Sequence, residues 1–156
     1  MSYRFFEDIV IADVAFEAEG KTLPKMFESA GLAVTATMVE DVKTVRQMKT
    51  KEIELKNKDI EHLLHDFLQE IIFEKDAHLL LFSGYKIKIQ QTKIQKADSG
   101  KLEAGSYILT AACKGEKLNM QKHELLVDVK AVSWHMFEVE HDNKTKKWRS
   151  FVILDV

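Results

Sequence analysis

The periodicity of apolar residues changes once along this chain, and this change limits the folds that it can adopt. Between residues 60 and 72, apolar side chains recur at helical spacing, at Ile60, Leu63, Leu64, Phe67, Leu68, Ile71 and Ile72. From about His78 onward, apolar and polar residues alternate instead, as in Tyr85–Ile89. A first half with helices and a second half of strands predicts an α+β fold, with two helices packed on a largely antiparallel sheet.

The first half adds a strand and another helix to this outline. The run from Val10 to Ala18 alternates as a strand, and Thr22 is placed to cap a helix that has Pro24 in its first turn. This helix is expected to continue to about residue 36. A short strand over Lys51–Lys56 then precedes the second helix, which either Asn57 or Asp59 can cap.

The last two strands are predicted to form a hairpin. Leu125–Glu140 and Lys147–Val156 both read as strands, and Asp142-Asn143-Lys144 between them is typical of a turn. Tyr107–Cys113 is a further strand. The polar stretches from Glu40 to Lys49 and from Lys114 to His123 are expected to be connections.

Composition indicates one globular domain over residues 1–156. Apolar residues make up 46% of the chain and charged residues 31%, and the net charge of −2 gives no basic excess of the kind that nucleic-acid binders show. No apolar stretch approaches a membrane span, and the N-terminus lacks the organisation of a signal peptide. The single cysteine, Cys113, fits a reducing cytoplasm, and its place in an alternating run favours inert packing.

Two carboxylates are the strongest candidates for a site. Asp13 lies in the first strand-like run and Asp155 in the last, and a carboxylate in an apolar strand is costly unless it is paired, hydrogen-bonded or bound to a cation. Pairs of carboxylates suit hard cations such as calcium or magnesium, and the terminal carboxylate of Val156 would add an oxygen beside Asp155. The alternative is that each aspartate occupies a solvent-facing strand position.

Other polar residues offer weaker signals. His62 and His65 lie three apart, a spacing that can chelate a metal, but no further ligands complete the set, so a solvated helix face is expected. Hydrogen-bonded structural roles are expected for His123 and His135. Asp66, at the edge of the apolar stripe, either hydrogen-bonds a neighbouring loop or lines a site.

Lys130 lies in the otherwise apolar VDVKAVSW run. Its ammonium group can reach solvent along its aliphatic stem, or it can bind a phosphate or a carboxylate of a partner. The motifs of nucleotide hydrolysis, dinucleotide binding, serine hydrolysis and dithiol exchange are all absent from the sequence. The sequence therefore does not predict an enzyme.

Taken in order along the chain, several short segments resemble the archease family. They are ADV at 12–14, EGKTL at 19–23, FESA at 27–30, IEHLLHDFLQE at 60–70, KHE at 122–124, VKAVSWH at 129–135 and VILDV at 152–156. The chain departs from the family pattern at Val10 and Ile11, where His-Thr usually precedes Ala-Asp, and its segment from Gln90 to Gly105 is longer than usual.

The resemblance implies a function as well as a fold. Archeases are small α+β proteins that assist the RtcB-type RNA ligase of tRNA splicing, promoting its guanylylation and repeated turnover. By matching position, the family's divalent-cation site, usually associated with calcium, falls on Asp13, Asp155 and Val156. The lysine implied in ligase activation falls on Lys130, and tRNA would be contacted only through the ligase.

Two other classes of function stay open from the sequence. One is a small metal-dependent hydrolase, in which Asp13 and Asp155 hold a cation that activates water. The other is a chaperone-like module for other RNA-processing or RNA-modifying enzymes.

Overall fold

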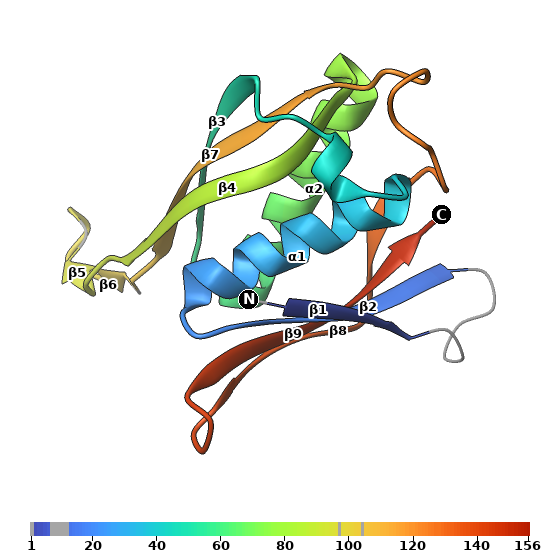
Figure 1. The fold of residues 1–156 in the computed structure, drawn as a ribbon. Coiled ribbons are helices and arrows are strands. Elements are labelled where there is room, and N and C mark those ends of the chain that lie inside the picture. Colours follow the sequence, from blue (N-terminus) through green and yellow to red (C-terminus); the bar gives the residue numbers. More distant parts are fainter. Residues whose placement is uncertain (1, 7–12, 97, 104) are drawn as a thin grey trace.

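Two helices lie between two antiparallel sheets in the computed structural model, which describes all residues except 1, 7–12, 97 and 104 (Figure 1). One sheet has four strands in the order β1-β2-β9-β8, formed by β1 (Ser2–Phe6), β2 (Asp13–Gly20), β9 (Lys147–Asp155) and β8 (Ala131–Asp142). The other has three strands in the order β3-β7-β4, formed by β3 (Lys49–Asn57), β7 (Tyr107–Lys117) and β4 (Leu80–Gln91). The predicted α+β class with two helices is confirmed.

The two helices begin where their capping residues predict. Thr22 caps α1 (Leu23–Met38), since its Oγ1 accepts a hydrogen bond from the Lys25 amide at 3.3 Å. Asp59, rather than Asn57, caps α2 (Ile60–His78) by accepting from the Glu61 amide at 3.0 Å. The helix α2 ends because Leu79 adopts a left-handed conformation with φ of 56°.

The apolar stripe of α2 forms the centre of the core. Leu63, Leu64, Phe67 and Leu68 are fully buried. The Phe67 ring lies 5.8 Å from Phe27 of α1 and 5.7 Å from Tyr85 of β4, measured between ring centroids, so one side chain joins both helices to the three-stranded sheet. Cys113 is buried in the same core and burial raises the pKa of its thiol to about 12, which confirms the expected packing role.

Several strand boundaries differ from the prediction. β1 was not predicted, and it pairs along β2 from Ser2–Glu19 to Phe6–Ala15. The alternating run Tyr85–Ile89 lies within a longer strand, β4, which has a bulge between Phe82 and Gly84. The strand predicted over Val10–Ala18 is β2, which begins at Asp13 and ends at Gly20, and residues 10–12 lie outside the described residues.

The strand expected over Leu125–Glu140 begins only at Ala131, so its first part was predicted wrongly. Residues 125–130, which we call the strap, run across the ends of both helices, and the Leu126 amide donates to the Met38 carbonyl at 2.8 Å. Only Lys130, at the end of the strap, is bonded to a strand; the rest is bonded to the end of α1 and to a side chain of α2, and its apolar composition alone did not distinguish it from a strand.

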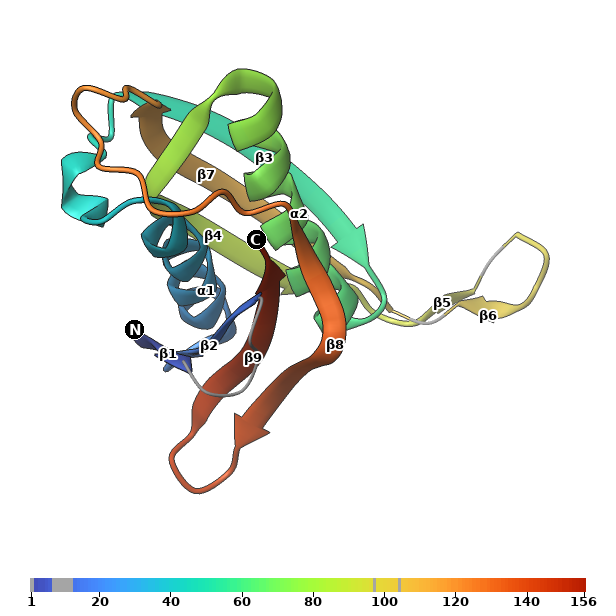
Figure 2. The same cartoon turned by 90° about the vertical axis from the view of Figure 1, so that its right-hand side faces the viewer.

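Two short elements complete the fold. A 3₁₀ helix, η1 (Val42–Thr44), interrupts the connection after α1. The strands β5 (Gln95–Lys96) and β6 (Leu102–Glu103) form a small ribbon that projects from the body of the molecule (Figure 2). This ribbon lies within residues 90–105, away from the four-stranded sheet in both views (Figures 1 and 2). No helix in the described part of the chain has the length and apolarity needed to cross a membrane.

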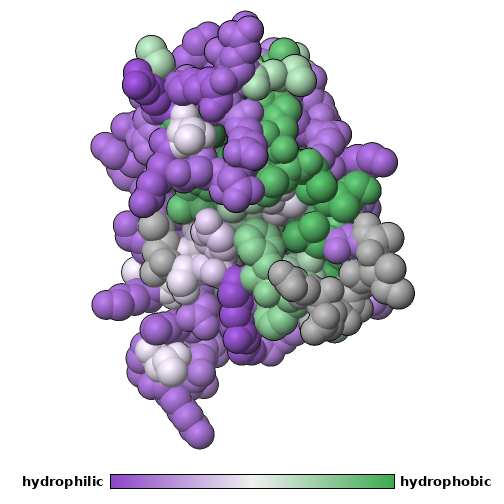
Figure 3. Space-filling view, turned by 45° about the vertical axis from the view of Figure 1, so that its right-hand side comes forward, coloured by the Kyte–Doolittle hydropathy of each residue, from purple (hydrophilic) through white to green (hydrophobic). Residues whose placement is uncertain are grey.

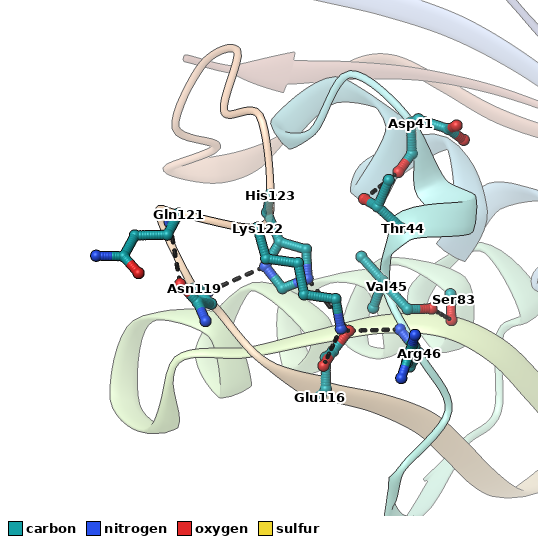
Figure 4. Close-up of polar contacts among 10 residues, drawn as sticks. All are labelled: Asp41, Thr44, Val45, Arg46, Ser83, Glu116, Asn119, Gln121, Lys122 and His123. Carbon is teal, nitrogen blue, oxygen red and sulfur yellow. Dashed lines mark hydrogen bonds and ion pairs between the residues drawn. The ribbon is translucent and has the colours of Figure 1, made fainter.

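A buried histidine and a glutamate join β7 to the connection that carries η1 (Figure 4). The Glu116 carboxylate accepts hydrogen bonds from the Arg46 amide at 2.6 Å and from the Lys122 ammonium at 2.6 Å. His123 Nδ1 accepts from the Asn119 amide at 2.9 Å, so its Nε2 carries the proton that is donated to Glu116 at 3.2 Å. The structural role expected for His123 is thereby confirmed.

The charge on Glu116 should stabilise the fold in a pH-dependent way. Partial burial raises the pKa of this carboxyl, but its hydrogen bonds from Lys122, Arg46 and His123 outweigh that effect and lower the pKa from 4.5 to about 2. Glu116→Gln should therefore reduce the free energy of unfolding by about 1–2 kcal/mol at pH 7.

Because the folded-state pKa is depressed, this contribution is complete above the unfolded-state pKa of 4.5 and is lost as the pH falls towards about 2. Urea denaturation at pH 7 and pH 3 checks this, with Glu54→Gln, an exposed carboxylate on β3, as the control. A difference between the Glu116 variant and wild type that is unchanged at pH 3 would contradict the assigned role of the charge.

Candidate functional site at the end of the four-stranded sheet

The two aspartates singled out in the sequence are direct neighbours in the sheet. Asp13 of β2 pairs with Asp155 of β9 in the antiparallel register, and Asp155 pairs on its other side with Ala131 of β8. Residues at paired positions project from the same face of a sheet, with Cβ atoms about 4.5–5.5 Å apart. Both aspartates are partly buried. The strands thus bring together two carboxylates that lie 142 positions apart in the sequence, as the numbers 13 and 155 show.

This pairing places two like charges side by side in the sheet. Like charges directly opposite each other on neighbouring strands destabilise a sheet, and a cation bound between them would offset that cost. Two carboxylates with main-chain oxygens and water are a donor set that suits a hard divalent cation. Among the residues that the structure describes, no group of three or more His, Cys, Asp and Glu side chains is placed to hold a metal ion. A cation here would therefore take its remaining oxygens from the main chain and from water.

Lys130 is held at the same end of the sheet. Its amide donates to the main-chain oxygen of Asp155 at 2.8 Å, and its side chain is exposed. Lys130 therefore precedes β8 at the level of the Asp13–Asp155 pair, with its ammonium group free to reach solvent or a partner.

The strap before Lys130 is anchored by polar side chains of α2. The ammonium of Lys75, whose side chain is only 8% exposed, donates to the Val129 carbonyl at 2.8 Å and pairs with Asp128 at 2.5 Å. Gln69 Oε1 accepts from the Val132 amide at 2.5 Å. These contacts flank Lys130 on both sides in the sequence, so α2 fixes the position of its backbone.

An apolar groove lies beside the strap. Leu125, Leu126 and Val127 are exposed, and with Met38, Leu81 and Leu118 they line a groove of about 190 Å³. Figure 3 shows apolar side chains gathered into a strip on one face of a surface that is otherwise largely hydrophilic. In that view it is the main apolar patch.

The histidines of α2 do not behave alike. His62 is exposed as predicted, whereas the prediction of a solvated position for His65 is wrong, because His65 is 9% exposed. The His65 ring stacks on Trp134 with 3.8 Å between ring centroids, and its Nε2 donates to the Val132 carbonyl at 2.9 Å. Burial lowers the pKa of His65, so the neutral ring is favoured.

The reason for this burial is a bulge in β8 that the sequence did not indicate. The register shifts between Ser133 and Glu138, and Met136 adopts a positive φ of 56°. The extra residues place Trp134 over the edge of α2, where it covers His65. Asp66, on the same helix, accepts a hydrogen bond at 3.4 Å from the side chain of Asn57, the last residue of β3, rather than from a neighbouring loop. His135 is exposed.

Comparisons with known proteins agree with this architecture. The fold is that of a small α+β protein in which two helices lie between antiparallel sheets. Its β2–β9 pair ends in two carboxylates. The Archease protein family (MTH1598/TM1083) matches residues 3–156, and the chain belongs to this family.

Individual relatives match along most of their length. The chain is 34% identical over 154 residues to the protein archease of Methanothermobacter thermautotrophicus, covering 99% of this chain and 98% of the relative. It is 30% identical over 145 residues to the protein archease of Pyrococcus furiosus, covering 93% of each. The solution structure of Methanobacterium thermoautotrophicum protein 1598 superposes with a TM-score of 0.71 at 30% identity, covering 99% of this chain and 98% of that one.

Proposed function

We propose that this protein is a non-enzymatic activator of an RtcB-type RNA ligase, which it would help to guanylylate and to turn over repeatedly during tRNA splicing. The observation that carries this proposal is the pairing of Asp13 with Asp155 beside Lys130. Two carboxylates lie at this end of the sheet together with the backbone of a residue whose ammonium group is exposed, a place from which they could enter the active site of a partner.

Asp13, Asp155 and the main-chain oxygens of Val156 would hold a divalent cation, calcium by the association within the family. When bound, the cation would supply positive charge that compensates the paired carboxylates and helps to order this end of the sheet. The protein's own contribution is to fix both carboxylates on one face through the β2–β9 register.

Lys130 would supply the complementary charge. Its backbone is fixed through Asp155 and through the strap, while its side chain is exposed. An ammonium group held in this way can pair with a phosphate or with an acidic side chain of the ligase. We further propose that the protein acts in the cytoplasm and contacts tRNA only through the ligase, because its net charge of −2 does not favour direct binding of phosphates.

The test is GMP loading of the cognate ligase under multiple-turnover conditions, with and without this protein. Substoichiometric amounts should accelerate loading, and Lys130→Ala should lose most of that effect while folding normally, because its side chain is exposed. No acceleration by the wild-type protein, with an active ligase, would reject the activator function. Hydrolysis of a phosphoester by the protein alone would instead support a metal-dependent hydrolase.

A further inference from the structure

No helix or second sheet packs over the outer face of the four-stranded sheet in the part of the chain that the structure describes, although Ala15 and Ile153 on this face are buried. The inner face carries Phe16 and Ala18, which are buried against the helices, whereas the alternate residues project outward. We define the outer face by the charged residues at these alternate positions. Its carboxylates are Asp13, Glu17, Glu19, Glu138, Glu140, Asp142 and Asp155, and its cations are Arg4, Lys147 and Arg149. The seven carboxylates and three cations named above give this face a formal charge of −4, whereas the net charge of the whole chain is −2.

A cleft of about 480 Å³ lies within the outer face and combines acidic walls with an apolar floor. Three carboxylates and one guanidinium group line it together with three apolar side chains, namely Glu17, Glu138, Glu140 and Arg149 with Met136, Phe137 and Phe151. Met136 is 53% exposed, and the Phe151 ring packs at 5.6 Å from that of Phe6, measured between centroids. Apolar groups beside carboxylates suit the side chains of arginine and lysine. Their aliphatic stems pack on the apolar groups while the charged end pairs with a carboxylate.

The protein's own arginines already use the outer face in this way. The guanidinium carbon of Arg4 lies 4.9 Å from the centroid of the Phe6 ring, and its Nη2 lies 3.5 Å from the Glu17 carboxylate. Arg149 pairs with Glu140. Among the described residues, however, no cation pairs with Glu138, whose closest charged neighbour on β8 is the carboxylate of Glu140. The neighbouring Glu140 raises the pKa of Glu138, as expected where two carboxylates lack a second cation.

We propose that the outer face docks a basic segment of a protein partner, with an arginine or lysine side chain seated in the cleft beside Glu138. Phosphate groups of RNA would be repelled by the same carboxylates, so the occupant is a protein. Glu17 follows Asp13 by four residues on the same face, about 13 Å at about 3.3 Å per residue. A partner that reaches the Asp13–Asp155 pair would therefore also cover the cleft. The identification of this partner as the ligase rests on the proposed function, whereas the basic chemistry of the occupant does not.

Association kinetics with the cognate ligase test this proposal. Glu138→Lys should slow association by about tenfold at about 50 mM salt, with a much smaller difference at about 500 mM, because attraction between exposed charges is screened. Glu138 is exposed, so the variant should fold normally. Glu54→Lys makes the same charge change at an exposed position of β3, in the other sheet, and should alter association less than twofold. Equal slowing by both variants, or by neither, would overturn the proposal.

A second probe separates the outer face from the function of the ligase. A tetra-arginine peptide added to the ¹⁵N-labelled protein should shift amide resonances of β8 and β9 around Glu138, and Glu138→Lys should reduce those shifts. If the ligase does not bind the wild-type protein but the peptide shifts these resonances, the docking chemistry stands and the ligase partnership falls. Shifts centred elsewhere, or equal shifts of this face by a short RNA, would overturn the proposal.

Discussion

If the proposed function is correct, calcium should stabilise this protein, and Asp155→Asn should abolish that gain and reduce stimulation of ligase guanylylation at least tenfold. The substitution removes one of the two paired carboxylates but keeps the main-chain oxygen that accepts from the Lys130 amide. A tenfold loss corresponds to about 1.4 kcal/mol, which is modest for the removal of a charged ligand. Asp13→Asn should behave in the same way, because it removes the other member of the pair.

The change in stability that Asp155→Asn causes should have the opposite sign when no cation is bound, which makes this prediction specific. In the presence of a chelator, Asp155→Asn should be at least as stable as the wild-type protein, because it relieves repulsion worth about 0.2–1 kcal/mol between opposed like charges. With calcium in excess, the wild-type protein should gain stability by mass action, whereas the variant should gain little. Thermal denaturation with calcium and with a chelator, together with GMP loading, measures all of these effects.

Glu54→Gln is the matched control, since it removes an exposed carboxylate from the other sheet. An equal gain in stability from calcium for wild type and Asp155→Asn would reject the cation site at this position. Loss of the calcium effect with full stimulation of the ligase would show instead that the cation is not needed for activation.

Phe67→Ala should lower the free energy of unfolding by about 3–5 kcal/mol. Phe67 is fully buried and its ring contacts Phe27 of α1 and Tyr85 of β4, so its truncation leaves a cavity where three elements meet. This loss is a large fraction of the roughly 5–15 kcal/mol by which a domain is stable. Urea denaturation should show a lower midpoint.

Phe73 of the same helix provides the control, because it is 47% exposed. Phe73→Ala makes the same chemical change and should alter the unfolding free energy by no more than about 0.5 kcal/mol. If the two substitutions cost the same, the side chain of Phe67 does not join the helices to the sheet as described.

Local interactions made much of the fold predictable from the sequence. The caps Thr22 and Asp59, the apolar stripe of α2 and the turn at Asp142–Lys144 act within a few residues, so their patterns indicate structure directly. The strap shows where this reasoning failed. Residues 125–129 are as apolar as a strand, but Lys75 and Met38, which lie far away in the sequence, hold them outside any sheet.

For the candidate site, the sequence provided the residues and the tertiary structure provided their proximity. Asp13 and Asp155 drew attention because each is a carboxylate in an apolar strand, and the resemblance to archease grouped them with Lys130. The register that makes the two aspartates neighbours depends on β9 lying between β2 and β8. Such an order of strands depends on long-range packing, which leaves no local pattern.

The sequence by itself determined the class of fold, its two helices, its closing hairpin and its family, because these follow from short-range periodicity and from residues in a fixed order. Only the tertiary structure decided that His65 is buried beneath Trp134, that α2 anchors the strap beside Lys130, and that acidic residues of β2 and β8 share one sheet face. The first depends on a bulge in β8, the second on side-chain contacts of Lys75, and the third on strand register, and all three are set by contacts between residues far apart in the chain.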